Sequence, residues 1–315
     1  MIKQNKKSEL IPYYETNRGQ AYLGDSLEIM RSLPDNSVNL ILTSPPFALT
    51  RQKEYGNKQE EEYIGWFLQF SKEFYRLIKD DGSLVIDLGG AYLPGHPVKS
   101  IYQYELLVQL CKEQNFFLAQ EFFHYNPARL PTPAEWVTIR RIRVKDSVNV
   151  VWWLSKSENP KSDNKRVLKP YSDSMKALLK NGYKAQLRPS GHDISEKFGN
   201  DNGGAIPPNL LKLANTESNS YYMKRCKELH IKPHPARFPK DFADFFIKFL
   251  TDVDDLVLDP FAGSNTTGFA SELLQRNWIS TEINERYLEG SKIRFEEEPN
   301  LFPIELKLDG KTQKV

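Results

Sequence analysis

The feature of this sequence that most limits its fold is the alternation of short apolar runs with segments of helical period. The runs at residues 38–42, 83–86 and 256–259 are largely apolar, as expected of strands that are buried on both faces of a sheet. Between them lie segments such as residues 60–79 and 239–250, where apolar residues recur every three or four positions. Strands that alternate with helices predict right-handed crossovers and a mostly parallel sheet, so the expected fold class is α/β.

Two stretches depart from this alternation. Strands are expected near residues 116–125 and 147–154 with no obvious helix between them, which predicts an antiparallel hairpin at one edge of the sheet. Residues 155–231 are polar and rich in Asn, Ser, Lys, Gly and Pro, but scattered Tyr and Leu favour a small folded insertion over a disordered linker. The expected organisation is one half of an α/β domain at 1–154, the insertion at 155–231, and the second half with a polar tail at 232–315.

Local signals place smaller elements. Residues 20–25 predict a short strand, and Ser26 is expected to cap the helix that follows it. The Asp-Asp-Gly sequence at residues 80–82 is expected to end the preceding helix before a strand that begins at Ser83. The basic residues from Arg140 to Lys145 fit either an exposed edge strand or a surface that contacts phosphates.

Composition narrows the function only slightly. The net charge of +2 neither demands nor excludes a nucleic-acid partner, because duplex binding needs a local basic face rather than a basic whole. Cys111 and Cys226 lack CxxC spacing and do not follow a proline, which favours buried or incidental thiols in a reducing cytoplasm. The chain start lacks an apolar signal region and no uncharged apolar run reaches about 18 residues, so a soluble cytoplasmic protein without membrane contact is expected, and no metal site is predicted.

The loop after residues 256–259 is typical of a nucleotide-type cofactor site. It has the sequence Asp-Pro-Phe-Ala-Gly-Ser-Asn-Thr-Thr-Gly at residues 259–268 and leads directly into a helical segment. Gly263 lets the backbone approach a ligand, and the start of the helix offers free N–H groups to a carboxylate or phosphate. Glu282 ends the next strand, where an acid that binds ribose hydroxyls is expected. Because the loop lacks the full G-x-G-x-x-G pattern, it favours S-adenosylmethionine over NAD, with a purely structural loop as the alternative.

A second loop, Thr-Ser-Pro-Pro-Phe at residues 43–47, follows the strand at 38–42. Open α/β sheets keep their ligands at the carboxyl ends of the strands, so the two loops are expected to meet at one edge of the sheet. The Ser44 hydroxyl and the Pro45 carbonyl can accept hydrogen bonds from an exocyclic amine, and prolines fix φ and remove competing N–H donors. Phe47 can stack on a base that has left a duplex. On these five residues alone, an ordinary proline turn is the alternative.

Together these motifs resemble the amino-group DNA methyltransferases, in the permuted class whose catalytic loop precedes the cofactor loop. The resemblance extends over roughly residues 19–290 and includes the segments 24–26, 43–49, 53–57, 188–193 and 234–239. It implies methyl transfer from S-adenosylmethionine to the N4 amine of a flipped-out cytosine in double-stranded DNA, as part of a restriction-modification system. It also points to a short palindromic target, with CAGCTG as the candidate. Asn265 departs from the glycine that most members of the wider class carry there.

The resemblance further implies roles for single residues. Asp25 is expected to bind the adenine amino group of the cofactor or to cap a helix, and Glu282 to bind the ribose. Asp87 is expected to orient Ser44 or take up a proton, with a structural role as the alternative. Catalytic residues are then Ser44, Pro45, Pro46, Phe47 and Asp87. Residues implied in cofactor binding are Asp25, Thr43, Pro235, Arg237, Phe238, Asp259, Phe261, Gly263, Asn265, Thr266 and Glu282. Residues implied in DNA contacts, with loop scaffolding as the alternative, are Arg51, Lys53, Arg188, His192, Asp193 and Asn202.

Several other functions remain open from the sequence. Adenine-N6 methylation uses the same scaffold but usually has Asp or Asn at the position of Ser44, so the serine favours cytosine. Cytosine-C5 chemistry needs a cysteine nucleophile, which neither cysteine fits. A NAD-dependent dehydrogenase would use Glu282, but residues 44–47 would then have no function. A DNA-binding module with an inactive cofactor site is a further alternative. A monomer on DNA is expected, with a weak dimer as the alternative.

Overall fold

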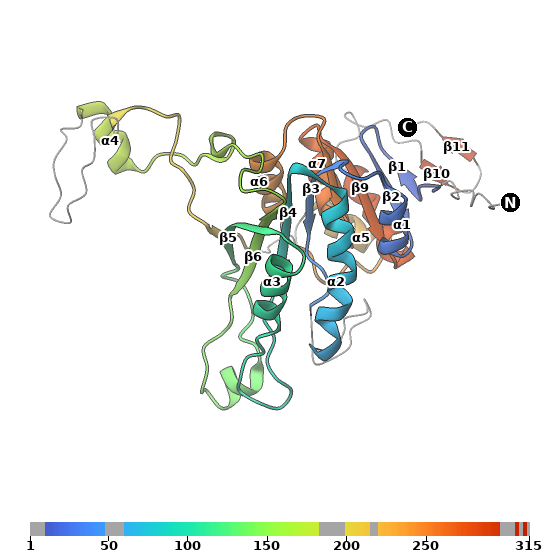
Figure 1. Cartoon of the computed structure of the whole chain (residues 1–315), viewed down its shortest axis with the longest axis horizontal. Helices are drawn as coiled ribbons and strands as arrows, with labels where there is room; N and C mark the ends of the chain where they lie inside the picture. Colours follow the sequence, from blue (N-terminus) through green and yellow to red (C-terminus); the bar gives the residue numbers. More distant parts are fainter. Residues whose placement is uncertain are drawn as a thin grey trace.

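The structure, a computed structural model, describes residues 10–47, 60–182, 199–214, 220–296, 306–308 and 311–313. In this part of the chain, nine strands form one twisted sheet, and β10 (Leu306–Leu308) pairs with β11 (Lys311–Gln313) separately (Figure 1). The sheet order is β1 (Tyr14–Glu15), β2 (Gly19–Leu23), β9 (Asn277–Glu282), β8 (Leu256–Asp259), β3 (Val38–Thr43), β4 (Ile78–Leu88), β6 (Val148–Ser155), β5 (Phe117–Tyr125) and β7 (Leu210–Lys212).

The central strands confirm the predicted α/β class. β2, β9, β8, β3 and β4 run parallel, and β6 is antiparallel to both β4 and β5. The predicted antiparallel hairpin is therefore present, but β6 lies inside the sheet against β4, and β7 pairs in parallel beyond β5. Because β5 is thus parallel to β4, the carboxyl ends of β3, β4, β5 and β8 all lie at the same edge of the sheet.

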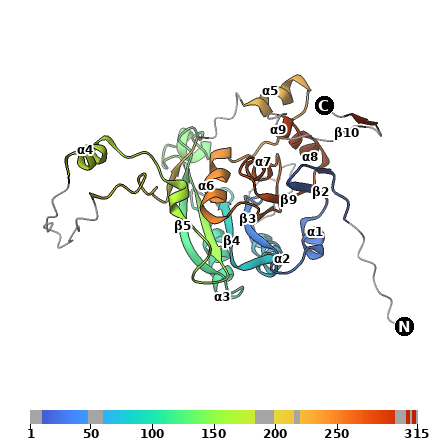
Figure 2. The ribbon, with the colours of Figure 1, turned by 90° about the horizontal axis from the view of Figure 1, so that it is seen from above.

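Helices cover both faces of the sheet (Figures 1 and 2). One face carries α1 (Ser26–Ser32), α2 (Glu60–Leu77) and α3 (Tyr102–Lys112), and the other carries α6 (Lys240–Leu250) and α7 (Thr266–Leu273). Beyond these, α8 (Glu285–Ser291) and α9 (Ile293–Glu296) pack near β2 and β9, and α5 (Tyr221–Glu228) packs on α9. The result is a three-layer arrangement with the sheet in the middle.

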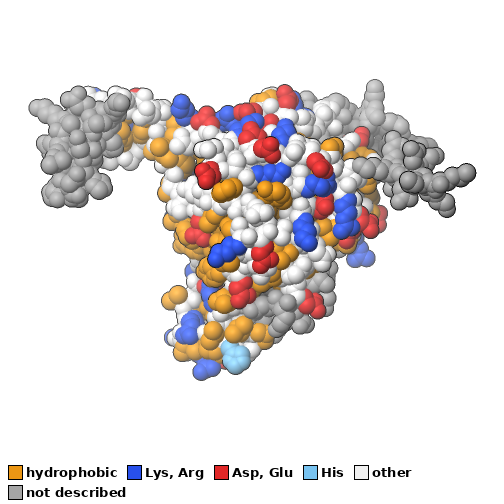
Figure 3. All heavy atoms as spheres, viewed as in Figure 1, with side chains coloured by type: hydrophobic (Ala, Val, Ile, Leu, Met, Phe, Trp, Pro, Cys, Tyr) orange, Lys and Arg blue, Asp and Glu red, His pale blue; other side chains and the backbone are white. Residues whose placement is uncertain are grey.

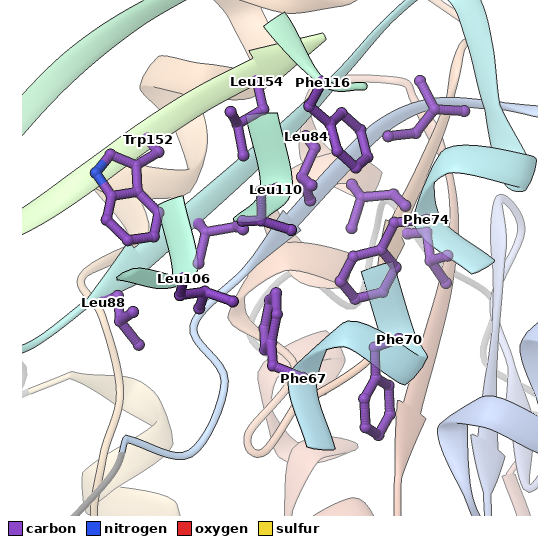
Figure 4. Close-up of a cluster of buried hydrophobic side chains, with 14 of the residues drawn as sticks. Phe67, Phe70, Phe74, Leu84, Leu88, Leu106, Leu110, Phe116, Trp152 and Leu154 are labelled. Atoms are coloured by element: carbon purple, nitrogen blue, oxygen red, sulfur yellow. The ribbon is translucent and has the colours of Figure 1, made fainter. Parts of the chain in front are cut away.

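Alternation along the central strands explains why the sheet is buried on both faces. In β3, Ile41 points into the cluster with α2 and α3, whereas Leu40 and Leu42 point into the cluster with α6. β4 and β6 alternate in the same way, and Figure 4 shows the α2 and α3 side of this core, where Phe67, Phe74 and Leu110 meet Leu84 and Leu154. Full burial of each such side chain is worth about 1.5–3 kcal/mol, so the two clusters fix the central strands.

Two local predictions were wrong, and one of the two alternatives for residues 140–145 is excluded. Asp25, and not Ser26, caps α1, because its carboxylate accepts a hydrogen bond from the backbone N–H of Leu27 at 2.7 Å. β4 begins at Ile78, directly after α2, and residues 80–82 lie inside it, next to a shift in its register with β3. Residues 140–145 form no strand. They belong to the connection between β5 and β6, after the short helix η1 (Glu135–Ile139), because this connection turns away from the sheet edge instead of pairing with it.

Two segments project from the layered body (Figure 1). The arm that carries α4 (Asp173–Asn181) leaves the sheet after the short helix η2 (Asn164–Val167) and returns to form β7. The connection between β5 and β6, residues 126–147, forms the lower tip, where hydrophobic and basic side chains mix on the surface (Figure 3). Among the described residues, no helix has the length and apolar character needed to cross a membrane.

Candidate active site

The two loops singled out by the sequence lie side by side. β3 and β8 are neighbouring parallel strands, with Leu40 opposite Val257 and Ile41 opposite Leu258. At their carboxyl ends the Thr43 hydroxyl donates a hydrogen bond to the Asp259 carboxylate at 2.8 Å. The predicted meeting of the loops at one edge of the sheet is therefore confirmed.

A cavity of about 490 Å³ opens at this edge. One end, here called the cofactor end, lies at the loops after β2, β8 and β9, and the other, the base end, lies at the carboxyl ends of β3, β4 and β5. Lining residues at the cofactor end include Asp25, Trp66, Phe70, Phe261, Gly263, Thr266 and Glu282. Lining residues at the base end include Ser44, Pro45, Pro46, Phe47, Asp87, His124, Asn126, Arg129 and Asn149.

Glu282 is held firmly at the cofactor end. Its two carboxylate oxygens accept hydrogen bonds from the backbone N–H groups of Gly263 at 2.9 Å and Asn284 at 2.8 Å. Burial raises the pKa of Glu282, while these N–H donors favour its charged form. Gly263 has φ +53°, and a Cβ there would lie 3.0 Å from the His234 ring. A carboxylate with remaining lone pairs therefore faces the cavity beside a backbone turn that only glycine fits easily.

An aromatic wall closes the same end. The Phe261 ring lies 5.0 Å from the Phe70 ring and 5.7 Å from the Trp66 ring, measured between centroids. Trp66 and Phe70 are four residues apart on α2, so both point toward the β8 loop. Neither residue was among the predicted site residues, although their helical spacing is visible in the sequence. The wall offers a flat apolar surface of the kind that stacks on a purine.

Several residues predicted to bind the cofactor support the loop instead of lining the cavity. Asp259 is buried and accepts hydrogen bonds from the Thr43 and Thr267 hydroxyls and from the backbone N–H of Phe261. Burial raises the pKa of Asp259 to about 6, although these donors stabilise its charged form. Asn265 is fully buried with φ +52°, caps α7 through the N–H of Gly268, and also contacts Ser280 and Tyr14. Asp259 thus ties the two loops together, and Asn265 shapes the turn before α7.

The segment at residues 234–239 borders the cavity as expected, but unevenly. Arg237 and Phe238 line it, whereas Pro235 does not. Burial lowers the pKa of His234 to about 4, and the nearby Arg237 and Arg294 add to this effect. The His234 imidazole is therefore neutral at physiological pH, and it lies edge-on against the Tyr287 ring at 4.5 Å.

The base end contains the predicted catalytic loop and a partner that sequence analysis missed. The Ser44 hydroxyl donates to the main-chain carbonyl of Asp87 at 3.2 Å. The Asp87 carboxylate lies instead 3.3 Å from Nδ1 of His124, and both side chains are buried. Phe47 packs against Gly89, where an added Cβ would lie 2.5 Å from its ring. The base end therefore combines the polar side chains of Ser44, Asp87 and His124 with the aromatic ring of Phe47.

Three further polar residues at the base end were also missed. Arg129 donates to the side-chain oxygen of Asn149 at 2.8 Å, and Asn126 lies next to them at the start of the projecting connection. These residues reach the cavity because β6 is antiparallel, which brings its first residues to the edge where β5 ends. For His124, the sequence signal that could have been used is a single histidine within the apolar sequence Phe-Phe-His-Tyr at residues 122–125.

The predicted DNA contacts are placed only in part. Arg51, Lys53, Arg188, His192 and Asp193 lie outside the described residues. Asn202 is exposed on the α4 arm, where its backbone N–H donates to the Tyr171 hydroxyl at 2.8 Å, and it does not line the cavity.

The fold and this cavity agree with the comparisons with known proteins. Residues 38–293 match the family model described as DNA methylase, which comprises N6 and N4 methyltransferases. The chain belongs to this family, as the resemblance in the sequence predicted.

Individual relatives agree with this assignment. The chain is 53% identical over 287 residues to the type II methyltransferase M.PvuII of Proteus hauseri, covering 90% of this chain and 85% of that protein. A solved structure of the PvuII DNA methyltransferase, described as cytosine-N4-specific, matches with a TM-score of 0.74 and 45% identity in the structural alignment, covering 92% and 93% of the two chains. A modification methylase from Thermus thermophilus, solved with S-adenosyl-L-methionine, has the same fold at 20% identity and a TM-score of 0.55, covering 88% of this chain and 93% of that one.

Proposed function

We propose that this chain is a site-specific DNA methyltransferase that transfers a methyl group from S-adenosylmethionine to the N4 amine of cytosine. The observation that carries the proposal is the single cavity shared by the Ser44 loop and the Gly263 loop at the ends of neighbouring strands. The similarity to M.PvuII supports cytosine-N4 specificity and a role in a restriction-modification system. We take CAGCTG as the candidate target on the same ground.

The cofactor end fits S-adenosylmethionine. Glu282 presents a carboxylate that suits a ribose diol, and the aromatic wall of Trp66, Phe70 and Phe261 suits an adenine ring. Asp25 keeps one carboxylate oxygen on the Leu27 N–H and lines the cavity, so its second oxygen suits the adenine amino group. When bound, S-adenosylmethionine supplies an electrophilic methyl group. The protein residues bind the two ends of the cofactor, and its methyl group is left accessible from the base end of the cavity.

The base end is suited to an amine. The N4 lone pair of cytosine is delocalised into the ring, so the amine is a poor nucleophile. Acceptors aimed at its hydrogens, such as the Ser44 hydroxyl and the Pro45 carbonyl, favour a pyramidal nitrogen whose lone pair is free to attack. Positioning and electrostatic alignment then supply most of the rate. Phe47 offers a stacking surface to the extruded base.

We propose that duplex DNA reaches this cavity along the projecting connection. Asn126 and Arg129 lie at the base end, and the projecting connection continues from them to the exposed Arg140 and Arg141. We propose that this connection contacts the phosphates on one side of the target, and that residues 155–231 recognise the bases. We also propose that the enzyme acts on cytoplasmic DNA as a monomer.

The phosphate contact gives a first prediction. Arg140→Ala is expected to weaken binding to any duplex by a similar factor and to reduce the slope of log affinity against log salt concentration by about 1. Fluorescence anisotropy at several salt concentrations measures both quantities. Lys112→Ala, which alters an exposed residue at the end of α3 outside the cavity and the proposed DNA contacts, is the matched control. A change in sequence preference without a change in slope would contradict phosphate contact.

Methylation of plasmid DNA followed by nucleoside mass spectrometry tests the proposed function. The purified chain with S-adenosylmethionine is expected to yield N4-methylcytosine, and duplexes with and without CAGCTG measure the site preference. N6-methyladenine alone would shift the assignment to adenine on the same scaffold. No methylated base from a chain that binds both DNA and S-adenosylmethionine would overturn the proposal.

A further inference from the structure

Asp87 and His124 form a buried polar pair at the base end of the cavity. Their side chains are 4% and 7% exposed, and Asp87 Oδ2 lies 3.3 Å from His124 Nδ1. Within the part of the chain that the structure describes, Asp87 Oδ1 and His124 Nε2 have no hydrogen-bond partner. A buried polar atom without a partner costs about 1–3 kcal/mol, so two such atoms beside a substrate cavity indicate that a ligand satisfies them.

The pair is held in place by three neighbouring strands. Asp87 lies near the end of β4 opposite Val151 of β6, and His124 lies near the end of β5 opposite Asn149. The Phe242 ring of α6 packs against the imidazole at 5.1 Å between centroids. His124 therefore has little freedom to turn away from Asp87 or from the cavity.

The contact with Asp87 selects the state of the imidazole. A carboxylate can only accept, so Nδ1 carries the hydrogen and donates it to Asp87 Oδ2. The other ring nitrogen, Nε2, then has a free lone pair. Asp87 Oδ1 and His124 Nε2 are thus two further acceptors at the base end, in addition to the Ser44 hydroxyl and the Pro45 carbonyl that orient the amine.

We propose that His124, positioned by Asp87, accepts the proton that the N4 amine loses when it is methylated. This inference rests on the proposed function. The N4–CH₃ bond forms as the bond between sulfur and the methyl carbon breaks, and sulfur keeps that electron pair. The amine nitrogen becomes cationic and passes one hydrogen, as a proton, to His124 Nε2. Imidazole is a stronger base than a carboxylate in water, so the proton rests on the ring, and the Asp87 charge stabilises the imidazolium that forms.

Two variants separate proton acceptance from packing. His124→Gln keeps a hydrogen-bonding group of similar reach but cannot take a proton, and His124→Phe removes both properties. With DNA and S-adenosylmethionine saturating, single-turnover methylation is expected to slow about 100-fold in His124→Gln, at the low end of the range for a positioned proton-transfer group, and further in His124→Phe. His230→Gln, which alters an exposed histidine after α5 and outside the cavity, is the matched control and is expected to keep the wild-type rate.

The pH profile supplies a readout that a structural role would not change. The charged and titratable groups that line the cavity with His124 are Asp87 of β4, Arg129 of the projecting connection, His234 and Arg237 before α6, and Asp25 and Glu282 at the cofactor end. Because a base must be unprotonated to accept a proton, wild-type turnover is expected to fall on acidification. In His124→Gln this acid limb is expected to vanish.

Binding measurements keep the test independent of folding and of the proposed function. His124→Gln is expected to bind S-adenosylmethionine like the wild type and to extrude a 2-aminopurine placed at the target position, seen as a rise in fluorescence. A wild-type rate, or an unchanged acid limb, in His124→Gln would overturn the role of His124 and leave the methyltransferase assignment intact. Failure of the wild type itself to form N4-methylcytosine would instead remove the proposed function.

Discussion

The buried carboxylates near the cofactor end of the cavity are hydrogen-bonded within the protein, whereas two buried acceptors at the base end lack a partner in the described part of the chain. Asp259 accepts three hydrogen bonds and Glu282 accepts two. By contrast, Asp87 Oδ1 and His124 Nε2 have no partner among the described residues. The two ends lie at one edge of the sheet but differ in how completely their polar atoms are hydrogen-bonded within the protein.

This difference separates what each end contributes. Hydrogen bonds within the protein fix the cofactor end before any ligand binds, so its residues act on folding and on cofactor affinity. The base end leaves Asp87 Oδ1 and His124 Nε2 to the substrate, so its residues act on turnover. Substitutions at the two ends should therefore change different measured quantities.

The largest effect is expected from the residue that ties the two loops together. Asp259→Ala leaves the donors of Thr43, Thr267 and Phe261 without their buried acceptor, and is expected to lower the free energy of unfolding by about 3 kcal/mol. Urea denaturation measures the change. Asp254→Asn, which alters an exposed ion pair with Arg18, is the control and should cost under about 1 kcal/mol. A stable Asp259→Ala protein would mean that the cofactor end is not held by these bonds.

A smaller and different effect is expected from Ser44. Ser44→Ala removes one acceptor for the amine while the β3 strand and its Asp259 contact stay in place, so the turnover number should fall about 100-fold. The dissociation constant for S-adenosylmethionine, measured by calorimetry, should stay within about twofold of the wild type. Ser37→Ala changes a serine remote from the cavity and serves as the control. Unchanged turnover would remove the Ser44 hydroxyl from the proposed mechanism.

The aromatic wall should show the reverse pattern. Phe261→Ala removes a ring that contacts both Phe70 and Trp66, and is expected to weaken S-adenosylmethionine binding about tenfold, since such ring contacts contribute about 0.5–1.5 kcal/mol beyond burial. Turnover at saturating cofactor should change little. Phe117→Ala, a half-exposed phenylalanine of β5 outside the cavity, is the matched control. Intact affinity together with slow turnover would assign Phe261 to the base end instead.

The last effect concerns His234 and depends on pH. Its pKa is about 4 in the folded protein against 6.5 for an unperturbed histidine, so the unfolded chain binds the proton more readily. The stability linked to its neutral form is fully present above pH 6.5 and is lost as the pH falls toward about 4. The difference in unfolding free energy between the wild type and His234→Gln should shrink over that range, as measured by urea denaturation at several pH values. A constant difference would show that His234 is not held neutral by burial.

Much of the fold was predictable because its signals are local. The apolar run of β8 gave the bounds of that strand, and the helical spacing of α2 and α6 placed them to within two residues. The start of β4 was missed because Asp80, Asp81 and Gly82 have the composition of a turn, yet their backbone continues the strand beside β3. Side-chain composition does not reveal such an irregular register.

The site was predictable where it is formed by loops directly after parallel strands. Ser44, Phe261 and Glu282 follow that rule, and all three line the cavity. His124 and Asn149 do not, because they reach the same edge only through the antiparallel insertion of β6 between β4 and β5. That pairing is set by contacts far apart in the sequence. Asn265 was assigned to the cofactor, but its left-handed backbone and buried amide hold the turn together instead.

The position of β3 between β4 and β8 has a consequence for the synthesis of the chain. Thr43 and its partner Asp259 are 216 residues apart, so the ribosome makes β3 and β4 long before the strand that covers the other side of β3 exists. At about 5–20 residues per second, that wait lasts about 10–40 s. During this time β3 has one unpaired edge flanked by apolar side chains, and a segment of this kind binds chaperones or aggregates when they are scarce.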